Sequence, residues 1–129
     1  MKTILKVVLF FQFEKFHVNN NNNNNNFIIY LECIKMAEDN SDFVIGFICQ
    51  KRLSENTAFL HMAPGIQLNE NGSEMKDSLG QQYTTPEMSI LDNRCDIVIV
   101  GRGIIKSENP VEAAMRYQKL AFDSYLKRL

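Results

Sequence analysis

The stretch Ile97-Val98-Ile99-Val100-Gly101-Arg102-Gly103 decides the fold that we expect, because a β-branched apolar run stops there at a glycine–arginine–glycine turn. Such a run favours a buried strand. The glycines let backbone N–H groups approach a ligand, and the arginine between them adds a guanidinium that pairs well with phosphate. Earlier in the chain, Gly80-Gln81-Gln82-Tyr83 supplies further hydrogen-bond donors. Together the two stretches predict the capture of a phosphate group.

Two more apolar runs precede this strand, at residues 43–48 and 59–63, and Pro64-Gly65 ends the second run. Short runs without alternation are typical of strands buried on both faces of a parallel sheet. We therefore expect strands at 43–48, 59–63 and 96–100 in an α/β fold. Ligands of such sheets gather at the carboxyl ends of the strands, so both phosphate-binding stretches are expected on the same side of the sheet.

Helices are expected between and after these strands, at residues 31–40, 85–91 and 109–129. Thr85-Pro86 and Asn109-Pro110 each place an N-cap residue before a proline in the first turn. The last helix is the best marked, because Glu112 completes a capping box with Asn109. Apolar residues recur along it at helical spacing, and its aromatic members are predicted to pack into the core: Tyr117, Phe122 and Tyr125.

Composition and charge exclude several classes of protein. The chain has 129 residues, of which 45% are hydrophobic, as expected for one globular domain. Its net charge of −1 argues against a nucleic-acid partner or an anionic membrane surface. The three cysteines, Cys33, Cys49 and Cys95, form no Cys-x-x-Cys pair, so neither a metal site nor a disulfide framework is expected. Reduced thiols indicate the cytoplasm.

Two polar positions near the predicted strands have ordinary explanations. His61 lies within an apolar strand and is predicted to be a satisfied core histidine rather than a catalytic base. Lys51-Arg52 follows the first strand and is assigned to a solvated loop. Neither position is assigned a catalytic role.

The first 29 residues differ from the rest. Asn19 to Asn26 are eight consecutive asparagines, which are predicted to be disordered. Residues 1–13 resemble a signal peptide, but Lys6 interrupts the apolar run and no small-residue cleavage site follows. A buried strand, or a segment foreign to the domain, is the favoured interpretation. We therefore divide the chain into an atypical segment, 1–29, and a folded part, 30–129.

From about Glu32 onward the chain resembles the C-terminal part of eukaryotic orotidine 5′-phosphate decarboxylases, including the decarboxylase domain of UMP synthase. The matching stretches occur in the family's order and near its spacing. They are Met36-Ala37-Glu38, Phe43-Val44-Ile45-Gly46-Phe47-Ile48, Phe59 to Leu68, Leu79-Gly80-Gln81-Gln82-Tyr83, Asp96 to Ile105 and Ala121 to Leu126.

The resemblance implies a (β/α)₈ barrel, of which this chain would hold about three strand–helix units, the sixth to the eighth. It also implies decarboxylation of orotidine 5′-phosphate to UMP without a cofactor, in a homodimer. By resemblance Gln81, Tyr83 and Arg102 hold the 5′-phosphate, Gly101 forms the turn beneath it, and Pro64 lines the pyrimidine side. One departure is Ala63, where the family pattern usually has threonine.

The family's lysine–aspartate array is a second departure. The array includes an Asp-x-Lys-x-x-Asp run, and none occurs in this sequence. A complete (β/α)₈ barrel also needs about 250 residues. We therefore expect a fragment that is inactive alone, derived from a truncated or split gene or a misplaced gene start. The alternatives are a non-catalytic nucleotide-phosphate binder and an interaction remnant that pairs its open sheet edge with an intact homologue.

Overall fold

A four-stranded parallel sheet organises the molecule. The computed structural model describes residues 7–10, 23–68 and 83–129. The strands lie in chain order: β1 (Val7–Phe10), β2 (Val44–Ile48), β3 (Leu60–Ala63) and β4 (Ile97–Val98). All three pairings are parallel, so the carboxyl ends of the strands share one edge of the sheet. The predicted parallel α/β architecture is confirmed.

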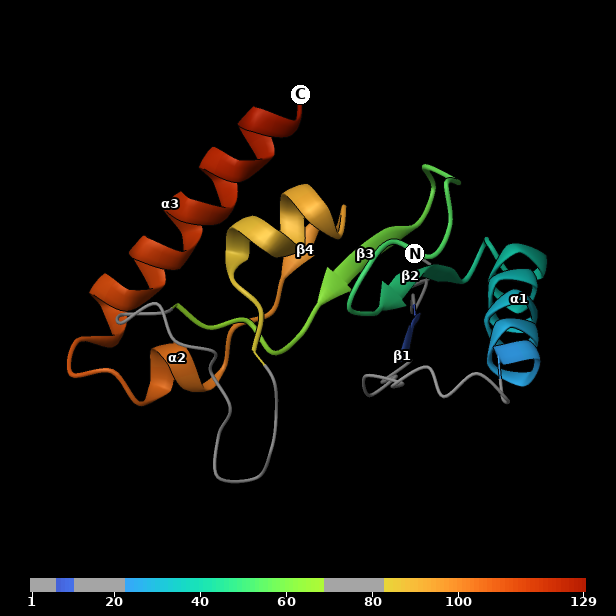
Figure 1. The fold of residues 1–129 in the computed structure, drawn as a ribbon, viewed down its shortest axis with the longest axis horizontal. Coiled ribbons are helices and arrows are strands. Elements are labelled where there is room, and N and C mark those ends of the chain that lie inside the picture. The colour runs from blue at the N-terminus through green and yellow to red at the C-terminus, as the bar shows by residue number, and fades with distance from the viewer. Residues whose placement is uncertain (1–6, 11–22, 69–82) are drawn as a thin grey trace, which may run out of the picture.

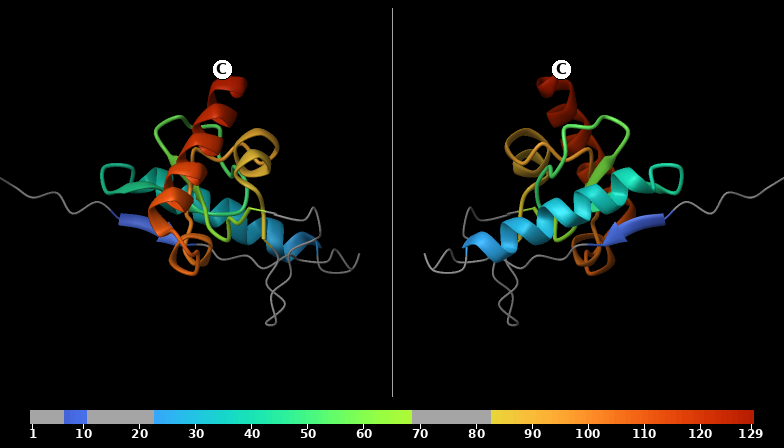
Figure 2. Two further views of the ribbon diagram at one scale, coloured as in Figure 1. Left: turned by 90° about the vertical axis from the view of Figure 1, so that its left-hand side faces the viewer. Right: turned by 90° about the vertical axis from the view of Figure 1, so that its right-hand side faces the viewer.

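Two long helices lie at opposite ends of this sheet (Figure 1). The first, α1 (Asn23–Asp39), precedes β2, and the last, α3 (Pro110–Arg128), follows β4. Views from the two sides place α3 nearest the reader in one and α1 in the other (Figure 2). Two short helices complete the fold: η1 (Met88–Asp92), wound as a π-helix, and α2 (Arg102–Ile105).

Local capping interactions agree with the sequence. Asn109 caps α3 because its side-chain oxygen accepts the amide N–H of Glu112 at 3.2 Å, and Pro110 occupies the first turn. Thr85 Oγ1 accepts the amide N–H of Met88 at 3.2 Å at the start of the predicted helix 85–91. Both helix starts are confirmed.

Two apolar clusters join the helices to one face of the sheet. The first gathers Ala37 of α1 against β2 and its neighbours, with Phe47 and Phe59 packed edge to face at a centroid distance of 5.3 Å. The second gathers Tyr117 of α3 against Ala63, Ile66 and Cys95. Both clusters lie on the helix-covered face, which is where the core sits.

The prediction that all strands are buried on both faces is wrong for β3 and β4. Leu60 and Ile97 are each 41% exposed, and Ile99 is 38% exposed, while Val98 and Val100 pack against the second cluster. Side chains alternate between the faces of a strand, and only one face carries helices here. The other face remains open in the described part of the chain.

The predicted core packing of α3 is wrong for Phe122 and Tyr125. Phe122 is 57% exposed and Tyr125 is 38% exposed, whereas Tyr117 is buried as predicted. Small side chains, among them Ser124, lie against the rest of the molecule instead. Along this buried side α3 packs against η1 and α2, whereas Phe122 and Tyr125 lie on its exposed side.

The segment that the sequence sets apart contributes regular structure. Within residues 1–29, β1 pairs with β2, and residues 23–26 form the first turn of α1 although the whole asparagine tract is predicted to be disordered. Residues 19–22 lie outside the described ranges. The division at residue 29 stays a prediction.

The described residues hold neither a membrane-spanning helix nor a cluster of metal ligands. Among the described residues, no helix has the length and apolarity that crossing a bilayer requires. In the same part of the chain, no group of three His, Cys, Asp or Glu side chains comes together as a metal site. All three cysteines are free thiols.

Candidate functional site

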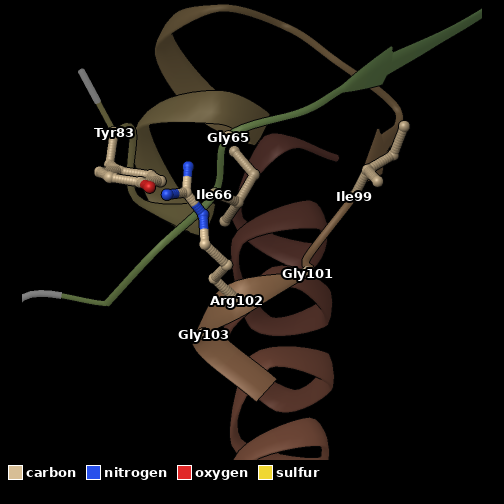
Figure 3. A pocket seen from close by; sticks show the side chains of 7 residues that line it. All are labelled: Gly65, Ile66, Tyr83, Ile99, Gly101, Arg102 and Gly103. Carbon is tan, nitrogen blue, oxygen red and sulfur yellow. The ribbon is translucent and has the colours of Figure 1, made fainter. Parts of the chain in front are cut away.

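A pocket of about 220 Å³ opens at the carboxyl ends of β3 and β4. Three separate segments build it: the turn after β3, the residues just before η1, and the turn from β4 into α2. The lining residues are Gly65, Ile66, Tyr83, Ile99, Gly101, Arg102 and Gly103 (Figure 3). Its position is where ligands of parallel α/β proteins bind.

Backbone hydrogen bonds carry Tyr83 to this pocket. The amide N–H of the neighbouring Thr84 donates to the carbonyl of Gly65 at 3.1 Å. The carbonyl of Thr84 accepts the amide N–H of Gln67 at 3.0 Å. The pair forms a parallel bridge between Ile66 and Thr84. Gly65 has φ +71°, a conformation that glycine adopts without a steric penalty. The turn after β3 therefore fixes the side of the pocket on which Tyr83 lies.

The Arg102 guanidinium lies beside the Tyr83 ring. Its Cζ atom is 5.3 Å from the ring centroid, within the range of a cation–π contact (Figure 3). Arg102 is the first residue of α2, and its side chain is exposed at the pocket. The contact holds a permanent positive charge at the mouth of the pocket, where it can meet an anion.

The turn below Arg102 is held by Tyr117 of α3. The Tyr117 hydroxyl accepts the amide N–H of Leu68 at 3.0 Å, and a Cβ on Gly103 would overlap the same hydroxyl. Only glycine at position 103 therefore lets α2 lie this close to α3. The second glycine of the Gly-Arg-Gly turn therefore serves this packing.

The structure brings together most of the residues that the sequence assigns to the site. Tyr83, Gly101 and Arg102 line the pocket. Pro64 directly precedes Gly65, and its carbonyl accepts Nε2 of Gln50 at 3.3 Å. Gln81 lies outside the described residues. Whether these residues bind a ligand stays a prediction.

Sequence reasoning passed over four lining residues. Gly65 and Ile66 directly follow Pro64, and Gly103 is the last residue of the Gly-Arg-Gly turn. Ile99 was assigned only to a buried strand, yet its half-exposed side chain lines the pocket. Residues 97–100 are all apolar, so no sequence signal distinguishes Ile99 from its neighbours.

A cluster of charged side chains lies at the opposite, amino-terminal ends of β3 and β4. The carboxylate of Asp96 accepts Arg52 Nη2 at 2.8 Å and Arg128 Nη2 at 3.2 Å, both at Oδ1. Its Oδ2 accepts the amide N–H of His61 at 3.0 Å. Arg52, assigned from the sequence to a solvated loop, is instead only 16% exposed. In (β/α)₈ folds this end of the strands serves stability rather than catalysis.

The predicted burial of His61 in the core is confirmed, but only one of its two ring nitrogens has a hydrogen-bond partner among the described residues. The side chain is fully buried, and its Nε2 accepts the amide N–H of Ser54 at 3.3 Å. Because Nε2 accepts, the neutral ring carries its proton on Nδ1, which lies 3.4 Å from Asp96 Oδ2. That His61 is not a catalytic base stays a prediction, with which its complete burial agrees.

Acid is expected to destabilise the protein through His61. Burial, aided by the charge of Arg52, lowers the pKa of His61 although Asp96 and Glu55 act in the opposite direction. Below about pH 6.5 the His61 side chain binds a proton in the unfolded chain more readily than in the folded chain. The free energy of unfolding therefore falls as the pH falls, by at most about 1.4 kcal/mol per pH unit. Urea unfolding at pH 7.5 and pH 5.5 measures this loss.

The matched variant is His61→Gln, which removes the titrating group. We expect a shallower dependence of its unfolding free energy on pH over the same range, whatever its absolute stability. Equal slopes for the two proteins would contradict the role of His61. Asp96 does not interfere: burial would raise its pKa, but the His61 amide and the charges of Arg52 and Arg128 hold it below the usual value.

The chain is similar in sequence and in fold to known orotidine 5′-phosphate decarboxylases. A sequence model described as the orotidine 5′-phosphate decarboxylase / HUMPS family matches residues 14–117. The chain is 51% identical over 96 residues to a uridine 5′-monophosphate synthase from Bos taurus and 44% identical over 99 residues to one from Naegleria gruberi. It is 45% identical over 105 residues to an orotidine 5′-phosphate decarboxylase from Hypocrea jecorina.

These relatives are considerably longer than the chain. The matches cover 74–76% of this chain but only 19% of each synthase and 28% of the Hypocrea decarboxylase. Among solved structures, the orotidine 5′-phosphate decarboxylase from Lactobacillus acidophilus matches with a TM-score of 0.54 at 22% identity. That match covers 90% of this chain and 49% of the other. The fold is therefore that of part of a (β/α)₈ barrel.

Proposed function

This chain belongs to the orotidine 5′-phosphate decarboxylase / HUMPS family, and we propose that it is the part of such an enzyme that holds the substrate's 5′-phosphate. The observation that carries the proposal is the position of Arg102. Its guanidinium lies against Tyr83 at the mouth of a pocket formed at the strand ends. The bound molecules would be orotidine 5′-phosphate and UMP.

The chemistry of the pocket suits a phosphate. A guanidinium offers two parallel N–H donors to phosphate oxygens, and its charge persists at every physiological pH. The flanking Gly101 and Gly103 leave the backbone around it without side chains, and a Cβ at Gly101 would meet nothing within 4 Å. We assign Gln81 and Tyr83 as further phosphate contacts and Pro64 to the pyrimidine side, as the resemblance implies.

We propose further that this chain does not decarboxylate by itself. The 129 residues contain no Asp-x-Lys-x-x-Asp run, so they lack the lysine that would protonate the carbanion. Decarboxylation would need a complete barrel, in which this portion supplies the phosphate grip. We place that reaction in pyrimidine biosynthesis in the cytoplasm, where free thiols such as those of this chain are stable.

Arg102→Ala is expected to weaken UMP binding by roughly 10- to 100-fold, the loss that follows when hydrogen bonds to a charged group are removed. Calorimetric titration of the full 129-residue chain with UMP measures the change. Arg116→Ala is the matched control, because it removes the same charge from an exposed position on α3. It is expected to leave UMP binding unchanged, and circular dichroism checks that both variants fold.

Two further titrations test whether binding depends on the phosphate group and whether the chain decarboxylates the substrate. Uridine, which lacks the phosphate, is expected not to bind, and orotidine 5′-phosphate is expected to bind without turnover. Equal binding of UMP and uridine, or an Arg102→Ala variant that binds as the parent does, would contradict the phosphate assignment. Release of CO₂ would contradict the argument from the missing motif.

A further inference from the structure

One face of the sheet has no cover within the described residues. Residues that alternate with the helix-packed face point to it, and Met62 and Ile97 are register partners on neighbouring strands. Leu60 and Ile97 are each 41% exposed, and Ile99 is 38% exposed. In a closed (β/α)₈ barrel such side chains fill the interior in packed layers.

Both edges of the sheet are also open in the described part of the chain. The strand order β1-β2-β3-β4 leaves β1 and β4 with one neighbour each, and all four strands run the same way. Four parallel strands are half of the eight that close a barrel, and the chain matches 49% of the length of a solved relative. A twofold axis along the strands would bring β4 of one copy beside β1 of the other, twice, in parallel.

Exposed apolar residues are not confined to the bare sheet face. Large exposed apolar residues also lie on the two helices that would meet across each seam, among them Met36 on α1 and Phe122 on α3.

We propose that a second copy of this chain covers the bare sheet face formed by Leu60, Met62, Ile97 and Ile99, with β4 of each copy pairing alongside β1 of the other in an eight-stranded parallel barrel. This arrangement buries the face and satisfies both sheet edges at once. It does not depend on phosphate binding. It places the two Arg102 pockets at the same end of the barrel.

Sedimentation equilibrium of the full chain tests the proposal, with a mass of twice 14.9 kDa as the expected result. Ile97→Lys is expected to weaken the dimer by at least about 100-fold, because the barrel interior would then hold two lysine ammonium groups. Ile105→Lys is the matched control, since Ile105 is 77% exposed on α2, away from the bare face, and it should leave the mass unchanged. The exposure of Ile97 in the monomer lets the variant fold, which circular dichroism checks.

Hydrogen–deuterium exchange then shows which surfaces meet. Residues 97–100 are expected to become protected as the protein concentration rises, because the free edge of β4 would gain hydrogen bonds. A monomer at all concentrations, or a dimer that survives Ile97→Lys or leaves residues 97–100 unprotected, would overturn the proposal. Protection of residues 97–100 that arises only when the first half of a relative's barrel is added as a separate polypeptide would also overturn the proposal.

Discussion

Gly46→Ala is expected to destabilise the fold by at least about 3 kcal/mol, a large part of the 5–15 kcal/mol that stabilises a typical domain. Gly46 lies in the middle of β2, opposite Leu60 of β3 and Val8 of β1. A Cβ there would overlap the carbonyl oxygen of Leu60 and lie 2.7 Å from its N and 2.8 Å from its C. These are backbone atoms, so no rotamer change relieves the overlap.

The backbone angle at Gly46 adds to the effect. Its φ of +157° is one that residues with a side chain rarely adopt, and β2 holds one residue more than β1 at this point, since Val7 pairs with Val44 and Val8 with Gly46. An alanine side chain would force β2 away from β3. The two apolar clusters of the core, which lie along the helix-covered face of these strands, would then be pulled apart.

Urea unfolding followed by circular dichroism measures this loss. Gly101→Ala is the control, because a Cβ there would meet nothing within 4 Å, and its stability should stay within about 1 kcal/mol of the parent. A Gly46→Ala protein as stable as the Gly101→Ala protein would mean that β2 and β3 are not paired as described.

Asp96→Ala is expected to lower the free energy of unfolding by roughly 3 kcal/mol, which is typical when one partner of a largely buried ionic group is removed. Asp96 is the single acceptor shared by Arg52 and Arg128, and the three side chains are only 16–23% exposed. Alanine would leave two guanidinium groups next to each other without a counter-charge, and the His61 amide without its acceptor.

The consequences of losing Asp96 extend across the fold. Arg52 also donates to the carbonyls of Arg94 and Ser54, and Arg128 donates to that of Cys95 at 2.7 Å. The cluster therefore ties the loop after β2 and the end of α3 to the start of β4. Removal of the Asp96 carboxylate would weaken the attachment of the loop after β2 and of the end of α3 at the same time.

Asp123→Ala is the matched control for this variant. Asp123 accepts Lys119 Nζ at 2.7 Å on the exposed side of α3, where the two side chains are 45% and 75% exposed. A surface pair of this kind contributes about 0.5 kcal/mol or less. Equal losses from the two substitutions in urea unfolding would show that the Asp96 cluster adds no more than a surface pair does.

Features that depend on neighbours in the chain could be predicted from the sequence. Asn109-Pro110 and Thr85-Pro86 begin helices because a cap and a fixed proline φ act within one turn. The apolar runs predict strands for the same reason, and β2 and β3 begin within one residue of the expected positions.

Features that depend on which surfaces meet could not be predicted in this way. Phe122 is as apolar as any core residue, yet α3 turns Tyr117 and Ser124 toward the molecule and leaves Phe122 outside. Arg52 and Asp96 are 44 residues apart, and no local pattern distinguishes their ion pair from two solvated charges. A strand within residues 1–13 was one of two interpretations that the sequence left open, and its pairing with β2 was not predicted.

The sequence by itself determined most of the strand and helix segments, the parallel α/β class and the family, since these rest on residue type and on the order and spacing of short stretches. Tertiary structure alone decided that the Arg102 guanidinium lies beside the Tyr83 ring, that Asp96 accepts hydrogen bonds from two arginines, and that one sheet face has no cover among the described residues. The physical reason is that hydrophobicity and charge say which groups can pair or be buried. Only the packing of distant segments selects which of them do.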